Sequence, residues 1–248
     1  MDWVKTFYSA QNEWFGVYLG EVEESHRERA ALINTMTSIG TKQILELGAG
    51  GGQTAIALAE LGHEVSMVEL LEESVLHAEK LSHQMKVAIN IQQGDFYTIN
   101  YQQSFDLICY FDSFGIGTDE DQRRLLKRIE MWLKPEGYVI IEVGATWYWA
   151  GVGNGKIMDL GACFRQYGFD AENSKLVDSW WRKDHPETVM RQYLRCYTPV
   201  DFKLLLQGTG LKMVGIEAGG RIDYDQMEFI KKTKLEEAMT YYVKLCKV

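Results

Sequence analysis

Apolar and polar residues alternate in a regular way from residue 41 to about residue 145. Short apolar runs that predict strands are followed by longer amphipathic stretches that predict helices. A strand followed by a helix, repeated several times, predicts a parallel β-sheet covered by helices on both faces. The predicted strands are 43–47, 64–69, 87–92, 105–111 and 137–143, and the predicted helices between them are 52–61, 71–85 and 119–133.

One helix of this core has clear signals at both ends. Thr118 stands before three acidic residues, a pattern that favours the start of a helix because the first turn carries partial positive charge. Leu125, Ile129 and Leu133 follow at four-residue spacing. Pro135 and the glycine two residues later predict the end of this helix.

The insertion after the fifth predicted strand breaks the alternation. Residues 146–197 begin with a tryptophan- and tyrosine-rich run and contain several glycines. Asp184-His185-Pro186 predicts a turn, and we expect a hairpin between residues 176–182 and 188–196 around it. This insertion would lie on the substrate side of the core.

The rest of the chain completes a single-domain architecture. Thr198-Pro199 predicts the start of a helix, which is followed by predicted strands at 211–217 and 241–246. We therefore expect one domain over residues 1–248. Its parts are a helical N-terminal cap (1–40), a cofactor-binding core (41–145), a substrate-side insertion (146–197) and a C-terminal helix with strands (198–248).

Composition narrows the classes of function. The net charge of −9 argues against a nucleic-acid partner, because phosphate binding needs clustered Lys and Arg. The four cysteines are far apart in the sequence and lack zinc-ligand spacing, so we expect reduced thiols and no metal site. No apolar run has the length of a membrane span or of a signal-peptide core. These features predict a cytoplasmic protein without a membrane or nucleic-acid partner.

A glycine-rich loop after the first predicted strand is the most specific signal. Gly48, Gly50 and Gly52 follow the apolar run that contains Glu46, and a helix is predicted directly after them. Glycine allows a tight turn and a close approach of the backbone to a ligand. The dinucleotide fingerprint would need a further glycine at position 53, which is Gln53. The loop therefore favours an adenosine-bearing ligand without a pyrophosphate.

Residues at the ends of three further predicted strands should lie beside this loop, since the carboxyl ends of parallel strands meet at one edge of the sheet. Glu69 ends the second predicted strand, where a carboxylate can accept hydrogen bonds from both hydroxyls of a ribose. Asp95 and Phe96 follow the third strand, where they can take the amino group and the ring of an adenine. Asp112 and Ser113 follow the fourth strand.

These motifs resemble those of the class I S-adenosylmethionine-dependent methyltransferases of the small-molecule type. The resemblance covers residues 43–145 well and 198–248 more loosely. It implies a Rossmann-like, doubly wound α/β fold with a seven-stranded, mostly parallel sheet whose last strand is antiparallel. It also implies S-adenosyl-L-methionine as cofactor. The expected cofactor contacts are Tyr18, Glu46, Gly48, Gly50, Gly52, Glu69, Leu70, Asp95, Phe96 and Asp112.

The acceptor side is less specific. Tyr148, Trp149 and Ser113 are the expected substrate contacts, because they follow the fifth and fourth strands. Tyr8, Trp14 and Tyr18 form a hypothetical lid over the cofactor. No residue is assigned as a general base, and the methylated atom can be a nitrogen or an oxygen of a small molecule. Trp180 and Trp181 are expected to offer a surface for a homodimer.

Other functions stay open at this point. A protein or RNA acceptor is compatible with the same cofactor loop, although the acidic composition makes RNA the weaker of the two. A protein that binds S-adenosylmethionine as a sensor, without transfer, would keep the same loop. An NAD-dependent oxidoreductase shares a related first strand-turn-helix unit, but Gln53 argues against it.

Overall fold

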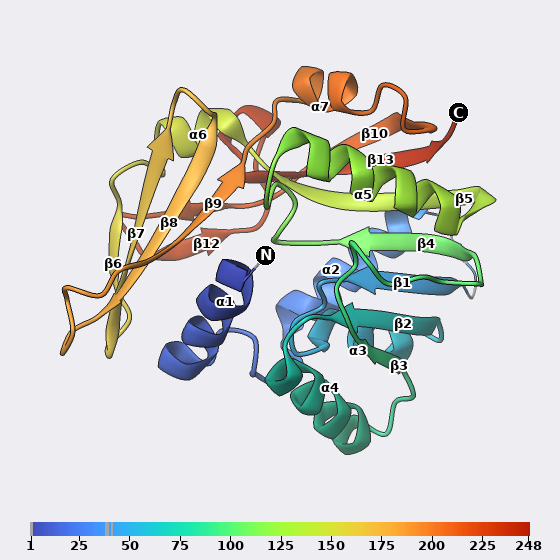
Figure 1. The fold of residues 1–248 in the computed structure, drawn as a ribbon, viewed down its shortest axis with the longest axis horizontal. Helices are drawn as coiled ribbons and strands as arrows, with labels where there is room; N and C mark the ends of the chain where they lie inside the picture. Colours follow the sequence, from blue (N-terminus) through green and yellow to red (C-terminus); the bar gives the residue numbers. More distant parts are fainter. Residues whose placement is uncertain (1, 38–39, 41) are drawn as a thin grey trace.

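The computed structural model describes residues 2–37, 40 and 42–248, and its largest element is a seven-stranded sheet (Figure 1). The strand order is β10-β13-β5-β4-β1-β2-β3. The strands are β1 (Gln43–Leu47), β2 (Glu64–Glu69), β3 (Asn90–Gln93), β4 (Phe105–Tyr110), β5 (Leu133–Gly144), β10 (Leu211–Ala218) and β13 (Thr240–Lys247).

The direction of the strands agrees with the predicted α/β fold. β1, β2, β3, β4 and β5 pair in parallel along the sheet. β13, the last strand of the chain, pairs antiparallel with both of its neighbours, β5 and β10. The mostly parallel, seven-stranded sheet with an antiparallel last strand is thereby confirmed.

Helices cover both faces of this sheet, so that its strands are buried on two sides. One apolar core lies under α2 (Glu24–Thr37), α3 (Gln53–Glu60) and α4 (Glu72–Met85). The other lies under α5 (Asp119–Trp132) and α7 (Pro199–Leu205). Alternate residues of each strand belong to different cores: Ile44 packs in the first and Leu45 in the second.

The predicted end of α5 needs a correction. Thr118 forms a capping box with Asp121, as the sequence indicated, but the helix ends at Trp132. Leu133 already belongs to β5, and Pro135 lies inside that strand rather than after the helix. The register with β4 is irregular just there, between Phe105 and the residues that follow. A proline fits such an irregular stretch because the regular ladder bond that it cannot donate is not required.

A second, antiparallel sheet follows β5 and extends away from the main sheet (Figure 1). Its strand order is β6-β7-β8-β9, and a short helix α6 (Thr146–Ala150) precedes it. The predicted hairpin exists as β8 and β9, whereas β6 and β7 were not predicted. The strands are β6 (Ile157–Asp159), β7 (Cys163–Asp170), β8 (Lys175–Arg182) and β9 (Met190–Arg195).

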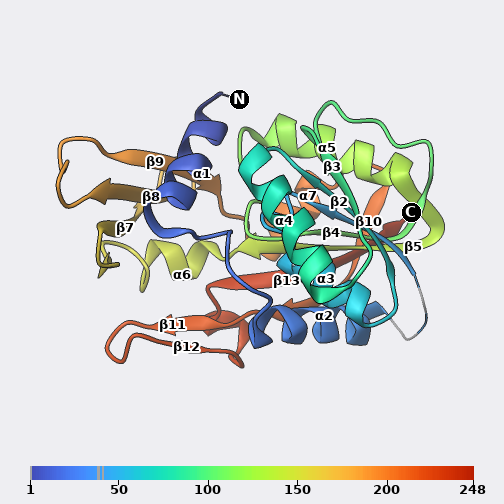
Figure 2. The same cartoon turned by 90° about the horizontal axis from the view of Figure 1, so that it is seen from below.

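Helix α1 (Asp2–Phe15) lies between this second sheet and the carboxyl ends of the central strands (Figures 1 and 2). A small hairpin of β11 (Arg221–Asp223) and β12 (Glu228–Ile230) lies near α2 (Figure 2), and a 3₁₀ turn (Leu235–Glu237) precedes β13. The carboxyl edge of the main sheet is thus enclosed by α1, the second sheet and the small hairpin.

None of the helices in the described part of the chain is long and apolar enough to cross a membrane.

Candidate cofactor and acceptor site

Two neighbouring cavities open at the carboxyl ends of the parallel strands. The smaller has a volume of about 250 Å³ and the larger of about 530 Å³. Tyr18, Gly48, Gly50 and Ser113 line both. Ligands bound in the two cavities would therefore meet at the glycine loop and at the end of β4.

The glycine loop has the left-handed backbone that favours glycine. Gly48 has a φ of 62° and Gly50 a φ of 55°. A Cβ on Gly50 would come within 3.1 Å of the Tyr18 ring, so a larger residue would press into the shared wall of the cavities. Gly52 differs: a Cβ there would meet Ala78 of α4 at 2.8 Å, and Gly52 is not among the described residues that line either cavity. Its role is close packing of α3 against α4.

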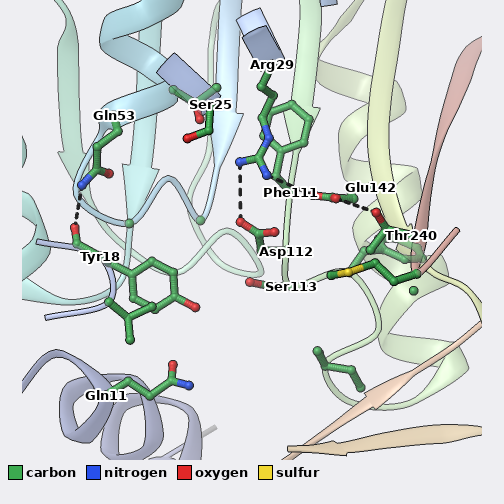
Figure 3. Close-up of a pocket in the computed structure, with 18 of the residues that line it drawn as sticks. Gln11, Tyr18, Ser25, Arg29, Gln53, Phe111, Asp112, Ser113, Glu142 and Thr240 are labelled. Atoms are coloured by element: carbon green, nitrogen blue, oxygen red, sulfur yellow. Dashed lines mark hydrogen bonds and ion pairs between the residues drawn. The ribbon is translucent and has the colours of Figure 1, made fainter. Parts of the chain in front are cut away.

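Gln53, which stands where the dinucleotide fingerprint has its further glycine, has a structural role of its own. Its side-chain nitrogen donates hydrogen bonds to the carbonyl oxygens of Tyr18 (3.0 Å) and Gly20 (2.9 Å), and the first of these is visible in Figure 3. The segment between α1 and α2 is thereby held across the glycine loop. A glycine at position 53 could not hold it there.

Glu69 lies in the wall of the smaller cavity, as predicted. Its carboxylate accepts hydrogen bonds from three backbone N–H groups, those of Gly50 (2.8 Å), Leu70 (2.7 Å) and Leu71 (2.9 Å). Burial raises the pKa of Glu69, and these three hydrogen bonds oppose the rise by stabilising the charged form. The carboxylate is thus fixed in place, with about one acceptor site left, on Oε2, for a ribose hydroxyl.

The rest of the smaller cavity suits a flat aromatic group. Phe96 lines it and packs edge-on against Tyr110, with ring centroids 5.3 Å apart. Asp95 also lines it, and one of its oxygens accepts a hydrogen bond from the Tyr97 backbone (2.8 Å). Leu70 completes the wall beside Glu69. These predicted cofactor contacts therefore lie together around one cavity.

Charged residues meet at the adjoining wall of the larger cavity (Figure 3). Arg29 of α2 lies over the Phe111 ring, 5.1 Å from its centroid. Its guanidinium forms ion pairs with Asp112 (3.6 Å) and Glu142 (3.5 Å). Glu142 also accepts a hydrogen bond from the Thr240 hydroxyl (2.9 Å). Arg29 thus joins the ends of β4 and β5.

Two carboxyl groups of this wall are buried and have perturbed acidity. Burial raises the pKa of Glu46 to about 8, against the opposing effect of Arg29. Burial and the neighbouring Asp112 raise the pKa of Glu142 to about 7. Within the described residues, Oε2 of Glu46 and Oε2 of Glu142 have no hydrogen-bond partner. A buried carboxylate without a donor favours a cationic ligand. Of the two, Glu46 is next to the glycine loop and would face the ammonium and sulfonium groups of S-adenosylmethionine.

The larger cavity continues between α1 and the second sheet. Trp149 lines it, as predicted, and Ser113 stands at its junction with the smaller cavity. Tyr148 is not among the described lining residues; its hydroxyl bonds to the backbone of Ile222 instead. Trp14 packs beside Trp180 in a separate apolar cluster. Of the three hypothetical lid residues, Tyr8 and Tyr18 therefore border a cavity and Trp14 does not.

A polar network crosses this cavity and was not predicted. The Tyr8 hydroxyl donates to Gln192 (2.9 Å) and lies 3.4 Å from the Ser113 hydroxyl. Gln192 donates to Asp178 (3.3 Å), which is fully buried and pairs with Arg165 through two hydrogen bonds (2.9 and 2.7 Å). This network connects α1 and the second sheet to the end of β4.

The residues that sequence reasoning missed come from elements outside the motif-bearing loops. Arg29 lies in a highly charged helix, where no spacing distinguishes it from its neighbours. Glu142 offered a weak signal, since it is an acidic residue within an otherwise apolar strand. Arg165, Asp178 and Gln192 belong to the second sheet, whose place beside the core depends on tertiary packing.

Comparison with known proteins agrees with the fold. Residues 44–137 match a family described as a methyltransferase domain. A protein of Geobacillus sp. (strain WCH70) that bears a methyltransferase name is 31% identical over 110 residues, which are 44% of this chain and 44% of that protein. The matched segment therefore spans less than half of that relative.

Solved structures extend the similarity to nearly the whole chain. The CcbJ methyltransferase of Streptomyces caelestis has a TM-score of 0.73 at 15% identity and covers 98% of this chain and 97% of its own. An S-adenosylmethionine-dependent methyltransferase of Clostridium acetobutylicum has a TM-score of 0.69 at 16% identity and covers 98% of each chain. Residues 44–137 thus match the methyltransferase domain family, and nearly the whole chain has the fold of these solved methyltransferases.

Proposed function

We propose that this protein binds S-adenosyl-L-methionine and transfers its methyl group to a nitrogen or oxygen of a small molecule. One observation carries the proposal. The carboxylates of Glu69 and Glu46 lie on either side of the glycine loop, each in the wall of one of two adjoining cavities. Such a pair suits a ligand that has a ribose at one end and positive charge at the other.

Different residues would bind different parts of the cofactor. Glu69 would hold the ribose, Asp95 and Phe96 the adenine, and Glu46 would face the positively charged part of the cofactor. Gly48 and Gly50 let the backbone approach it closely. The bound cofactor supplies an activated methyl group, so the protein has to align the acceptor with it and exclude water.

The larger cavity supports transfer to a small acceptor rather than binding alone. Its volume of about 530 Å³ lies within the range of about 300–1,000 Å³ typical of small-molecule sites. Its walls include Trp149, Tyr167 and Phe114, which would exclude water from the reacting atoms. A sensor without transfer activity would not need this second, aromatic cavity next to the cofactor.

Calorimetry with S-adenosylmethionine, S-adenosylhomocysteine and NAD tests the cofactor. We expect the first two to bind and Glu69→Ala to weaken both about 10- to 100-fold, because it removes charge-assisted hydrogen bonds worth about 1.5–3 kcal/mol. Glu72→Ala is the matched control, since Glu72 is an exposed acidic residue near Glu69. Binding of NAD alone would overturn the proposal.

Transfer is tested by a screen of small molecules with isotopically labelled cofactor. Methylation of a small amine or alcohol supports the proposal. Tight cofactor binding with methylation of only a protein or an RNA would refute the small-molecule acceptor. Tight binding without transfer to any acceptor class would favour the sensor function.

A further inference from the structure

The larger cavity has an excess of negative charge at the wall formed by β1, β4 and β5. Glu46, Asp112 and Glu142 line this wall, and Arg29 is the cation that faces them. The other two arginines that line the cavity have partners of their own: Arg165 pairs with Asp178 and Arg195 with Asp119. Three carboxyl groups therefore share a single guanidinium.

The cofactor would balance only part of this charge. S-adenosylmethionine has a sulfonium, an ammonium and a carboxylate, and so has one net positive charge. Burial keeps Glu46 mostly protonated until a cation binds beside it. If the positive charge of the cofactor lies against Glu46, Arg29 is left to balance both Asp112 and Glu142. Asp112 is exposed, so water can stabilise its charge, but Glu142 is buried. An unbalanced charge on Glu142 is costly, and a second cationic ligand beside it would relieve that cost.

A buried oxygen marks where that second cation would bind. Glu142 is 7% exposed, it lines the cavity, and its Oε2 has no hydrogen-bond partner among the described residues. The nearest cation is Arg29, whose nitrogen is 3.5 Å away, and Thr240 bonds only to the other oxygen of Glu142. Oε2 is thus held in place with an acceptor site left open.

The backbone at Asp112 supports the same location. Asp112 has a φ of 61°, a left-handed conformation that L-residues seldom adopt, and the Ser113 N–H bonds back to the Phe111 carbonyl (2.8 Å). Aspartate tolerates this conformation better than most residues, and strain of this kind is often found at functional sites. The turn places the Asp112 carboxylate in the cavity beside Glu142 (Figure 3).

We propose that the methyl acceptor is an amine, that its protonated nitrogen binds between Asp112 and Glu142, and that Glu142 accepts its proton. This inference rests on the proposed methyltransferase function and specifies its substrate class. The aromatic residues Trp149, Tyr167 and Phe114 farther along the cavity favour an amine attached to an apolar or aromatic body.

The chemistry balances with these groups. An N–H bond of the ammonium breaks and an O–H bond forms on Glu142, which leaves a neutral amine. The nitrogen lone pair would then form the N–C bond to the methyl carbon. The C–S bond would break at the same time, and the electron pair of that bond would stay on sulfur. The product is an N-methylated ammonium, and Glu142 returns its proton to solvent when the product leaves.

The acidity of Glu142 suits this exchange. Burial and Asp112 raise its pKa to about 7, while Arg29 of α2 and the Thr240 hydroxyl of β13 act in the opposite direction. Glu46 of β1, Tyr242 of β13 and His26 of α2 are the other titratable groups around this wall. A proton acceptor with a pKa near neutrality can take a proton and release it again in each cycle.

The test compares matched amines and alcohols on protein loaded with S-adenosylhomocysteine. The probes are 2-phenylethylamine and tryptamine against 2-phenylethanol and tryptophol, with binding measured by calorimetry at neutral pH. We expect each amine to bind about tenfold or more tightly than its alcohol, as a buried charge-assisted hydrogen bond predicts. With Glu142→Gln this preference should fall at least severalfold, because only Asp112 is left to pair with the ammonium.

Two controls separate this inference from the proposed function. Glu21→Gln removes an exposed carboxylate at the rim of the same cavity and should keep the amine preference. The affinity of Glu142→Gln for S-adenosylhomocysteine should stay within about threefold of the wild type. If wild-type protein fails to bind S-adenosylhomocysteine, the proposed function itself is wrong.

The amine inference can fail while cofactor binding succeeds. It is overturned if the alcohols bind as tightly as the amines, if none of the amines binds, or if Glu142→Gln keeps the preference. Methyl transfer to the amine gives an independent readout. With Glu142→Gln the rate should fall, and the inflection near neutral pH in its pH profile should be lost.

Discussion

The buried carboxyl group of Glu46 gives a sharp prediction about stability and pH. Its pKa of about 8 in the folded protein compares with an ordinary value of 4.5. Glu46→Gln keeps the shape of the protonated side chain and removes its ability to ionise. We expect this substitution to stabilise the ligand-free protein at alkaline pH and to change little at acidic pH.

The sign and size follow from proton linkage. Because the folded state holds the proton of Glu46 more tightly than the unfolded state, the wild type loses unfolding free energy as pH rises from about 4.5 to about 8. At about 1.4 kcal/mol for each pH unit, the loss reaches about 4–5 kcal/mol above pH 8. Glu46→Gln avoids this loss, so the difference between the two proteins should grow across that interval.

Urea unfolding at several pH values between about 5 and about 9 measures this difference. The other buried carboxyl groups, Glu69 and Glu142, are present in both proteins, so the difference between the curves reports mainly Glu46. Glu79→Gln is the control, because Glu79 is exposed on α4 and its curve should run parallel to that of the wild type. Parallel curves for the wild type and Glu46→Gln would refute the reasoning.

Three further substitutions test the loop and its supports. Gly50→Ala places a Cβ against Tyr18 at a left-handed backbone position, and should lower the free energy of unfolding by about 1–2 kcal/mol and weaken S-adenosylhomocysteine binding, as urea unfolding and calorimetry would show. Gln53→Ala removes two hydrogen bonds to the Tyr18–Gly20 segment, so amide exchange there should become faster in a deuterium-exchange experiment. Thr118→Ala loses the capping box of α5 and should cost about 1 kcal/mol in urea unfolding without changing cofactor affinity. Unchanged exchange in Gln53→Ala, or unchanged stability in either of the others, would contradict the corresponding contact.

The parallel core could be predicted from the sequence because its local signals agree with its tertiary structure. The strand at 43–47 is an apolar run buried on both faces, and Thr118 caps a helix in the predicted place. β7 could not be predicted in the same way. Its half-buried residues, such as Arg165, satisfy their polar groups through partners on β8. Pairing across strands supplies what the local pattern lacks.

The residues of the candidate site also differ in whether local sequence signals could predict them. Residues at or just after the ends of parallel strands, such as Glu69, Asp95 and Asp112, could be placed around the cavities because the topology of the sheet brings those ends together. Arg29 and Glu142 could not, since their proximity depends on how α2 packs against β5. Gly52 shows the opposite case, in which a residue of the motif serves helix packing instead of the ligand.

The hydrogen bonds of Gln53 have a consequence for the order of events in turnover. They hold the carbonyl groups of Tyr18 and Gly20, and the Tyr18 ring lines both cavities. A displacement of this segment that admits one ligand therefore reshapes the compartment of the other. Entry and departure of the two ligands become coupled steps, and steady-state kinetics should show an ordered sequence of binding instead of independent exchange.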